Sequence, residues 1–457
     1  MTQPQAPLVS SVELHDNNEN PDTTFPSPSD KDAQNDALLQ ASLAADSENP
    51  DGGYGWVVLF ACVVIAWWYI SISYTWGIFQ IALLRQQQQQ QQQEGRQHIS
   101  ASTLAFVGSL CPSFIASLAI PNAKLVRAVG PRATALIGMS VMGVGCILAS
   151  FTTGHVGGLF VTFGVLCGVG NSMLFMVINV APSQWFSKKR GLANGMIYAA
   201  GGLGGAVMSF VLDALIKGLG IPWAFRIQGL AMLGTGLPAA HLLRTRYPIP
   251  PTKMVEWTMF RDARFIVLFA AGAVTTFPLY VPPFFLPLYA EALSLSSDAG
   301  VSLVAGFNFA SAVGRLGCGY AGDVLGSVNA LLLAVTLNAL TMLIIWPLSD
   351  SLGPLIPFVI LNGMANGGFF AIMPTIISSI FGSARLSVAM GMIVTGWFGG
   401  YLLGPPIAGY ILEATGDESS IRTYRPAIFF AGAMAAASVI LVGAIRLLID
   451  RELRKKV

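Results

Sequence analysis

Charged side chains are scarce in this sequence. Asp, Glu, Lys and Arg make up only 11% of its 457 residues, whereas about a quarter is usual in a soluble globular domain. Hydrophobic residues make up 54%, and the mean hydropathy is +0.63. Such a chain lacks the charge to cover a surface that faces water, so we expect an integral membrane protein whose surroundings are the lipid bilayer. The net charge of +2 gives no support for a nucleic-acid partner.

The sequence also lacks the motifs of an enzyme or of a pump driven by a nucleotide. It contains no Walker A motif, no HExxH motif and no nucleophile elbow. The five cysteines lie inside apolar runs, which is typical of small buried hydrophobic side chains rather than disulfides or metal ligands. We therefore expect no enzymatic activity, no cofactor, no metal ion and no bound nucleotide.

The first 50 residues lack any apolar run. They hold nine of the 23 acidic residues and a single basic one, Lys31. This composition predicts a disordered acidic cytosolic tail over residues 1–50. Because the tail has neither the basic nor the apolar region of a secretory signal, we expect no cleaved signal peptide.

Long apolar stretches dominate the rest of the chain. About 20 apolar residues suffice to cross the hydrocarbon core as a helix, so we expect an all-α membrane protein. The seventh stretch contains four prolines and should be bent. The predicted spans are residues 55–81, 101–121, 133–152, 158–181, 191–214, 222–243, 265–290, 300–321, 328–348, 354–378, 387–412 and 426–447.

Lys and Arg are unevenly distributed between the loops on the two sides. If residues 1–50 are cytosolic, the loops on that side hold most of these residues, including SKKR at 187–190. The opposite side holds few, such as Arg85 and Lys217. This asymmetry predicts that both termini are cytosolic. The glutamine run at 86–93 should then lie in the first outer loop, as a repeat expansion exposed to solvent.

Two parts of the chain repeat each other. The segment CGVGNSMLFMVINVAPSQWFSKKRGLANG from Cys167 aligns without gaps with NGMANGGFFAIMPTIISSIFGSARLSVAM from Asn362. Such parallel repeats predict two six-helix halves of the major facilitator arrangement, with a substrate site between them near mid-membrane. The predicted boundaries are 51–243 for the N-terminal half, 244–264 for a cytosolic connector, 265–447 for the C-terminal half and 448–457 for a short cytosolic tail.

Four short stretches resemble one branch of that superfamily. DGGYGW at 51–56 and WFSKKRGLANGMIYAAGGLGG at 185–205 resemble signatures of the monocarboxylate porter family, and so do GRLGCGYAGD at 314–323 and GPPIAG at 404–409. The resemblance covers residues 51–448. It implies transport by alternating access between an inward-open and an outward-open state.

Arg315 is the one charged residue that lies well inside a predicted span. Asn308 and Ser311 precede it by seven and four residues and share its helix face. A snorkelling arginine is the structural alternative, whereas the resemblance implies that Arg315 binds an anionic substrate. The family's animal lactate carriers have an aspartate where this chain has Ser311, and a lysine in the first span that is missing here, so proton coupling by that set is not indicated.

Six further residues are candidates for substrate binding or gating, and one of them is Arg190 of the SKKR loop. Asn171 and Asn366, which the repeat superimposes, and Tyr74 could line the substrate path, although buried asparagines also bridge helices and aromatic side chains also pack. Asp51, at the start of the first helix, is favourable there. Together with Asp323 and Arg190, it is a candidate for the inner gate.

These features predict a secondary active transporter in the cell membrane. Its cargo would be a small organic anion such as a monocarboxylate; whether protons are coupled, and whether the membrane is instead vacuolar, stay open. A second hypothesis keeps the mechanism and replaces the cargo with a larger compound, such as a secondary metabolite or riboflavin. A non-transporting nutrient sensor is a third, although such sensors resemble transporters with long cytosolic tails.

Overall fold

The computed structural model describes residues 52–94, 100–186, 190–246, 255–381, 383–416 and 420–449. Every regular element in these ranges is helical. Ten of the helices are long and apolar enough to cross a membrane, and Ala101–Ser117 is a shorter apolar helix. The prediction of an all-α membrane fold is therefore confirmed.

The helices of the N-terminal half account for the first six predicted spans. Gly130, with φ 85° and ψ 160°, forms a sharp corner inside α5, so the second span continues to residue 129 and the third begins at Pro131. The elements in chain order are α2 (Gly55–Tyr74), α3 (Trp76–Glu94), α4 (Ala101–Ser117), α5 (Ala119–Ala149), α6 (Val156–Leu159), a π-helical segment (Phe160–Cys167), α7 (Gly168–Val180), a 3-10 turn (Pro182–Gln184), α8 (Arg190–Leu219), α9 (Ile221–Ala231), a second π-helical segment (Met232–Gly236) and α10 (Leu237–Leu242).

The C-terminal half follows the same plan. Its first span is bent as its prolines predict, because α11 ends at Leu279 and α12 begins at Val281. The elements are a 3-10 turn (Trp257–Arg261), α11 (Ala263–Leu279), α12 (Val281–Ala292), α13 (Ser297–Leu325), α14 (Ser327–Leu340), a π-helical segment (Thr341–Ile345), a 3-10 turn (Trp346–Leu348), α15 (Leu352–Phe381), α16 (Ser383–Gly396), α17 (Phe398–Thr415) and α18 (Ile421–Ile449).

Several helices are longer than the apolar pattern predicts. The fifth span, predicted at 191–214, extends over Arg190–Leu219 as α8. The glutamine run at 86–93, predicted as a loop, continues α3 to Glu94. Hydropathy marks only the part of a helix that lies in hydrocarbon, and glutamine is a good helix former. The expectation of a loop there was wrong.

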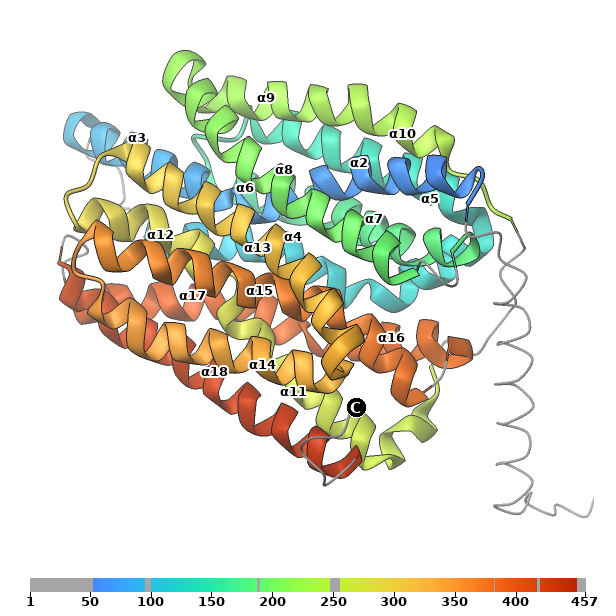
Figure 1. The fold of residues 1–457 in the computed structure, drawn as a ribbon. Helices are drawn as coiled ribbons and strands as arrows, with labels where there is room; N and C mark the ends of the chain where they lie inside the picture. Colours follow the sequence, from blue (N-terminus) through green and yellow to red (C-terminus); the bar gives the residue numbers. More distant parts are fainter. Residues whose placement is uncertain are drawn as a thin grey trace, which may run out of the picture.

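The two halves lie side by side along their length (Figure 1). The main contacts between them are made by α8 with α13 and by α4 with α17. Both interfaces depend on glycine: a Cβ at Gly202 of α8 would lie 2.8 Å from the Ala312 nitrogen, and one at Gly409 of α17 would lie 2.8 Å from the Ser102 Cα. The helices can approach this closely only because those side chains are missing.

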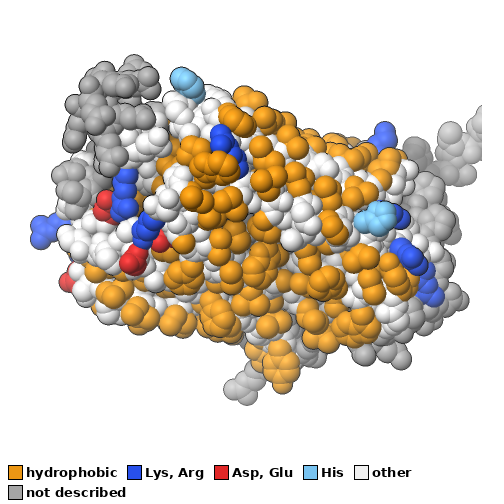
Figure 2. Space-filling view, turned by 90° about the horizontal axis from the view of Figure 1, so that it is seen from above, with side chains coloured by type: hydrophobic (Ala, Val, Ile, Leu, Met, Phe, Trp, Pro, Cys, Tyr) orange, Lys and Arg blue, Asp and Glu red, His pale blue; other side chains and the backbone are white. Residues whose placement is uncertain are grey.

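The bundle has two polar ends, which we name by what lies there. The termini face is the end where α2 begins at Gly55 and α18 ends at Ile449, and the glutamine face is the opposite end, where α3 reaches Glu94. Figure 2 shows hydrophobic side chains across the middle of one side of the bundle, with charged side chains gathered toward the two ends. This distribution fits a protein that spans a bilayer with its ends in water.

Candidate functional site

Arg315 lies deep in the bundle, between the two halves. It is 18 residues from the start of α13 at Ser297, or about 27 Å along the helix, and its side chain is 1% exposed. Its Nη1 donates a hydrogen bond of 2.6 Å to the carbonyl of Tyr198 in α8. None of the ion pairs recorded among the described side chains involves Arg315. Its hydrogen-bond partner is therefore a backbone carbonyl in the opposite half.

Five aromatic side chains form a closed loop of contacts with Arg315. We call them the aromatic cage. The Arg315 Cζ lies 5.7 Å from the centre of the Tyr74 ring and 5.8 Å from that of Phe370. The remaining distances between ring centres are Tyr74–Tyr280 5.0 Å, Tyr280–Tyr401 5.4 Å, Tyr401–Trp397 6.0 Å and Trp397–Phe370 6.2 Å. Only Tyr74 comes from the N-terminal half.

Three residues of the cage lie where a span is interrupted. Tyr74 is the last residue of α2, Tyr280 separates α11 from α12, and Trp397 separates α16 from α17. Discontinuous helices near mid-membrane form the substrate sites of many transporters, because the interruption frees backbone groups and turns side chains inward. The position of the interruptions supports a binding site at the cage.

Asn366 of α15 connects one of these interruptions to the other half. Its Nδ2 donates a 2.7 Å hydrogen bond to the Leu279 carbonyl at the end of α11, and its Oδ1 accepts a 2.9 Å hydrogen bond from the Tyr74 hydroxyl. Asn171, its counterpart in the repeat, donates only to Ser73 Oγ, at 3.4 Å within its own half. The two asparagines, both buried, therefore have different roles: Asn366 bridges the halves, whereas Asn171 does not.

Asn308 and Ser311 face different neighbours of α13. A Cβ at Gly205 of α8 would lie 2.9 Å from Asn308 Cγ, and a Cβ at Gly367 of α15 would lie 2.9 Å from Ser311 Oγ. Both residues are at most 1% exposed. In the described part of the chain, Asn308 Nδ2, Ser311 Oγ, Arg315 Nε and Asn171 Oδ1 have no hydrogen-bond partner. Polar atoms that are buried without a partner are costly, so a polar ligand that reached any of them would relieve part of that cost.

The proposed inner-gate residues cannot be placed. Asp51 lies outside the described residues, and so do the side chains of Arg190 and Asp323, although their backbones belong to α8 and α13. Their role in gating stays a prediction.

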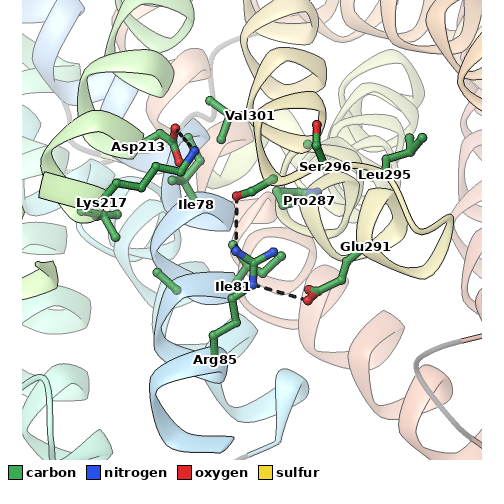
Figure 3. Close-up of a pocket in the computed structure, with 14 residues that line it drawn as sticks. Ile78, Ile81, Arg85, Asp213, Lys217, Pro287, Glu291, Leu295, Ser296 and Val301 are labelled. Atoms are coloured by element: carbon green, nitrogen blue, oxygen red, sulfur yellow. Dashed lines mark hydrogen bonds and ion pairs between the residues drawn. The ribbon is translucent and has the colours of Figure 1, made fainter. Parts of the chain in front are cut away.

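Sequence reasoning missed a group of polar contacts between the halves at the glutamine face. Arg85 of α3 approaches Glu291 of α12 at 3.4 Å and Ser297 at 3.2 Å, while Lys217 of α8 contacts both Asp213 and Asp298. Figure 3 shows four of these side chains, Arg85, Glu291, Asp213 and Lys217, around a cavity of about 60 Å³, which is far too small for an organic cargo. Because most of them are 40% exposed or more, each pair contributes little stability.

A stronger contact joins α17 to the start of α4 at the same face. The Glu413 carboxylate accepts a hydrogen bond of 2.7 Å from the backbone N–H of Ser102 and one of 3.1 Å from its hydroxyl. The first turn of α4 has no acidic residue of its own. Glu413 therefore supplies, from the other half, the negative charge that a helix N-terminus favours. We call this contact the Glu413 cap; like the ion pairs, it joins the two halves at the glutamine face.

Comparisons with known proteins agree with this architecture. The sequence matches the Major Facilitator Superfamily over residues 56–316 and 268–457. It is 11% identical to a structure of the nucleoside transporter NupG, with a TM-score of 0.64 over 86% of this chain and 100% of that one, which shows the shared fold. The chain belongs to the major facilitator superfamily, whose members are transporters and not enzymes.

Three relatives with named functions in transport or efflux come from fungi. The chain is 27% identical to MFS transporter asaE of Aspergillus flavus, over 86% of this chain and 88% of the relative. It is 28% identical to the Fujikurins efflux protein of Gibberella fujikuroi, over 95% and 93%. It is 25% identical to the Aspyridones efflux protein apdF of Emericella nidulans, over 88% and 82%.

The Glu413 cap can be tested by removing its charge. Glu413→Gln keeps the size of the side chain but loses the interaction of the carboxylate with the helix, worth about 0.3–1 kcal/mol. We expect the ratio of open to closed glutamine faces to rise about two- to five-fold. Spin labels at His155 and Ser351, which are exposed near that face in opposite halves, report the separation by pulsed electron paramagnetic resonance.

Glu291→Gln is the matched control, because it removes an exposed charge and should change the distances less. A distance distribution in Glu413→Gln that equals that of the unsubstituted protein would show that the cap does not hold the halves together.

Proposed function

We propose that this protein is a secondary active transporter that exports an organic compound larger than lactate by alternating access. The observation that carries the proposal is similarity along most of the chain to two proteins named for the efflux of specific products, the fujikurins and the aspyridones. The site supports it, because five large aromatic side chains surround one arginine between the halves.

A small monocarboxylate, the leading hypothesis from the sequence, has less support. The four signature-like stretches favour the monocarboxylate porter branch, but the relatives described above are not named as monocarboxylate carriers. The site offers Arg315 for an anionic group but, among the described side chains, no carboxylate is paired with it to take up a proton. We therefore keep the hypothesis that the cargo is an anion but not the hypothesis that it is as small as a monocarboxylate.

The contacts between the halves suggest how the cycle would run. With the glutamine face closed by the Glu413 cap, cargo would enter from the termini face and reach Arg315. Opening would then break the cap, the Arg85–Glu291 pair and the Tyr74–Asn366 hydrogen bond, all of which join the two halves. For an exporter in the cell membrane, the termini face would be cytosolic.

Efflux can be tested with membrane vesicles turned inside out from yeast that expresses the protein. Vesicles are energised and incubated with an organic extract of a fungal culture, and accumulated compounds are identified by mass spectrometry. We expect accumulation of one or more compounds larger than lactate, above the level in vesicles without the protein. Saturable transport of labelled lactate or pyruvate, with no accumulation of larger compounds, would instead support the monocarboxylate hypothesis. No transport of either kind would favour a sensor.

Arg315 should be the residue on which transport of an anionic cargo depends most. Arg315→Lys keeps a point charge but loses the planar fork that donates two parallel hydrogen bonds to a carboxylate. Because a hydrogen bond to a charged group contributes about 1.5–3 kcal/mol, we expect transport to fall about ten-fold or more in Arg315→Lys and to vanish in Arg315→Ala. Initial transport rates are normalised to the amount of protein in the membrane.

Arg226→Ala is the matched control, because Arg226 bonds to Ser150 Oγ away from the cage. If Arg315→Ala reached the membrane and transported at the normal rate, Arg315 would be a structural residue.

The orientation predicted from Lys and Arg can be tested by labelling. With the termini face in the cytosol, a tag inserted at Gln90 should react with a membrane-impermeant reagent in intact cells, whereas a tag at Lys189 should react only after permeabilisation. The reverse pattern would place the termini outside, and the direction of transport would have to be reconsidered.

A further inference from the structure

The chemistry of the cage restricts the kind of cargo group that it can hold. Four of its side chains, Tyr74, Tyr280, Trp397 and Tyr401, are at most 4% exposed. Their rings contact one another in tilted or edge-to-face arrangements, with centres 5.0 to 6.0 Å apart, as is typical of aromatic packing. A flat conjugated group of a ligand can replace such ring contacts, whereas a saturated ring, with hydrogen atoms on both faces, cannot approach as closely.

The unpaired polar atoms on α13 near Arg315 in the sequence are mostly hydrogen-bond donors. Asn308 Nδ2 and Arg315 Nε are donors only, and Ser311 Oγ can donate or accept. They lie at intervals of about one turn along α13. Asn171 Oδ1 is an acceptor, but it belongs to the opposite half. A ligand that satisfies the α13 set must therefore offer acceptor oxygens.

The charge of the site excludes the usual occupant of an aromatic cage. Cages of aromatic side chains commonly bind organic cations, but here a guanidinium is itself one of the walls. None of the recorded ion pairs of the described residues places a carboxylate against Arg315. A cationic ligand would meet an unneutralised positive charge in a medium of low dielectric, where repulsion is strong.

The connection between the halves also gives the cage a side that opens. Tyr74 is its only member from the N-terminal half, and it is held there by the hydrogen bond to Asn366 and by its ring contact with Tyr280. A movement of one half against the other removes one wall and leaves the remaining four rings and Arg315 together. A flat group could then enter beside Arg315.

From these observations we propose that the cage binds a planar, conjugated group of the cargo that bears anionic or carbonyl oxygens. The group packs against the rings of Tyr74 and Tyr280, and its oxygens accept hydrogen bonds from Arg315 and Asn308. This proposal rests on the proposed function, because it names the chemical class of the exported compound. The cage proposal goes beyond the proposed function because the cage could bind such a group whether the cargo is exported or imported.

The test uses binding to the purified full-length protein in lipid nanodiscs, measured by calorimetry. The three probes are naphthoate, decahydronaphthoate, which carries the same carboxylate on a saturated skeleton, and naphthylmethylammonium, which is planar but cationic. We expect naphthoate to bind about ten-fold more tightly than either of the others, because stacking and the Arg315 contact are both satisfied only by a planar anion.

Two variants show whether the preference arises in the cage. Tyr280→Leu should reduce the preference for naphthoate over decahydronaphthoate to about two-fold or less, whereas Tyr280→Phe should keep it. Tyr410→Leu is the matched control, because Tyr410 is 68% exposed on the outside of the bundle. If Tyr280→Leu fails to fold, the probe series with the unsubstituted protein still decides the matter.

Each outcome has a separate meaning for the two proposals. Equal binding of the planar and saturated anions, tighter binding of the ammonium probe, or no binding of any probe would overturn the planar-anion assignment. Efflux measured in vesicles would be unaffected by those results, so the proposed function would remain. Preferential binding of naphthoate without efflux of any compound would support the assignment and contradict the proposed function.

Discussion

A buried arginine that has no carboxylate partner among the described residues is the feature on which the rest of the site depends. Placing arginine at the centre of a membrane helix costs about 2.5–3.5 kcal/mol even on the mildest scale. Here the side chain is 1% exposed, with one hydrogen bond to a backbone carbonyl and two aromatic faces beside it. Among the described residues, these contacts leave the Nε of Arg315 without a hydrogen-bond partner. An arginine that served only to join helices would normally be neutralised, so this one is better explained by a ligand.

The closure of the glutamine face and the closure of the cage are consequences of the same packing. α17 carries Glu413 near its end and Tyr401 twelve residues earlier, so one helix contributes to both the cap and the cage. α13 likewise carries Asp298 at the glutamine face and Arg315 deep inside. A rocking movement that breaks the contacts at the face must therefore shift the walls of the cage. This is the mechanical coupling that alternating access requires.

The sequence predicted the framework of the protein better than its site. Apolar runs gave the spans, and the prolines around Tyr280 gave the bend between α11 and α12. Arg315 was identified because a lone charge inside an apolar run is conspicuous. The aromatic cage was not identified from the sequence. Aromatic residues make up 10% of the chain, and only the folded structure shows which five of them lie together. No residue pattern around Trp397 predicted the interruption between α16 and α17. The contact of Glu413 with α4 was not predicted either, because an acidic residue near the end of a span is common.

The repeat that builds the fold does not extend to the site. Asn171 and Asn366 are superimposed by the repeat, yet Asn366 bonds across the halves and Asn171 bonds only to Ser73. Arg315 and four of the five cage residues belong to the C-terminal half. The two halves thus share one architecture but contribute different residues to the site. The C-terminal half carries most of the groups that would recognise the cargo, and the N-terminal half contributes the wall, Tyr74, whose departure would expose it.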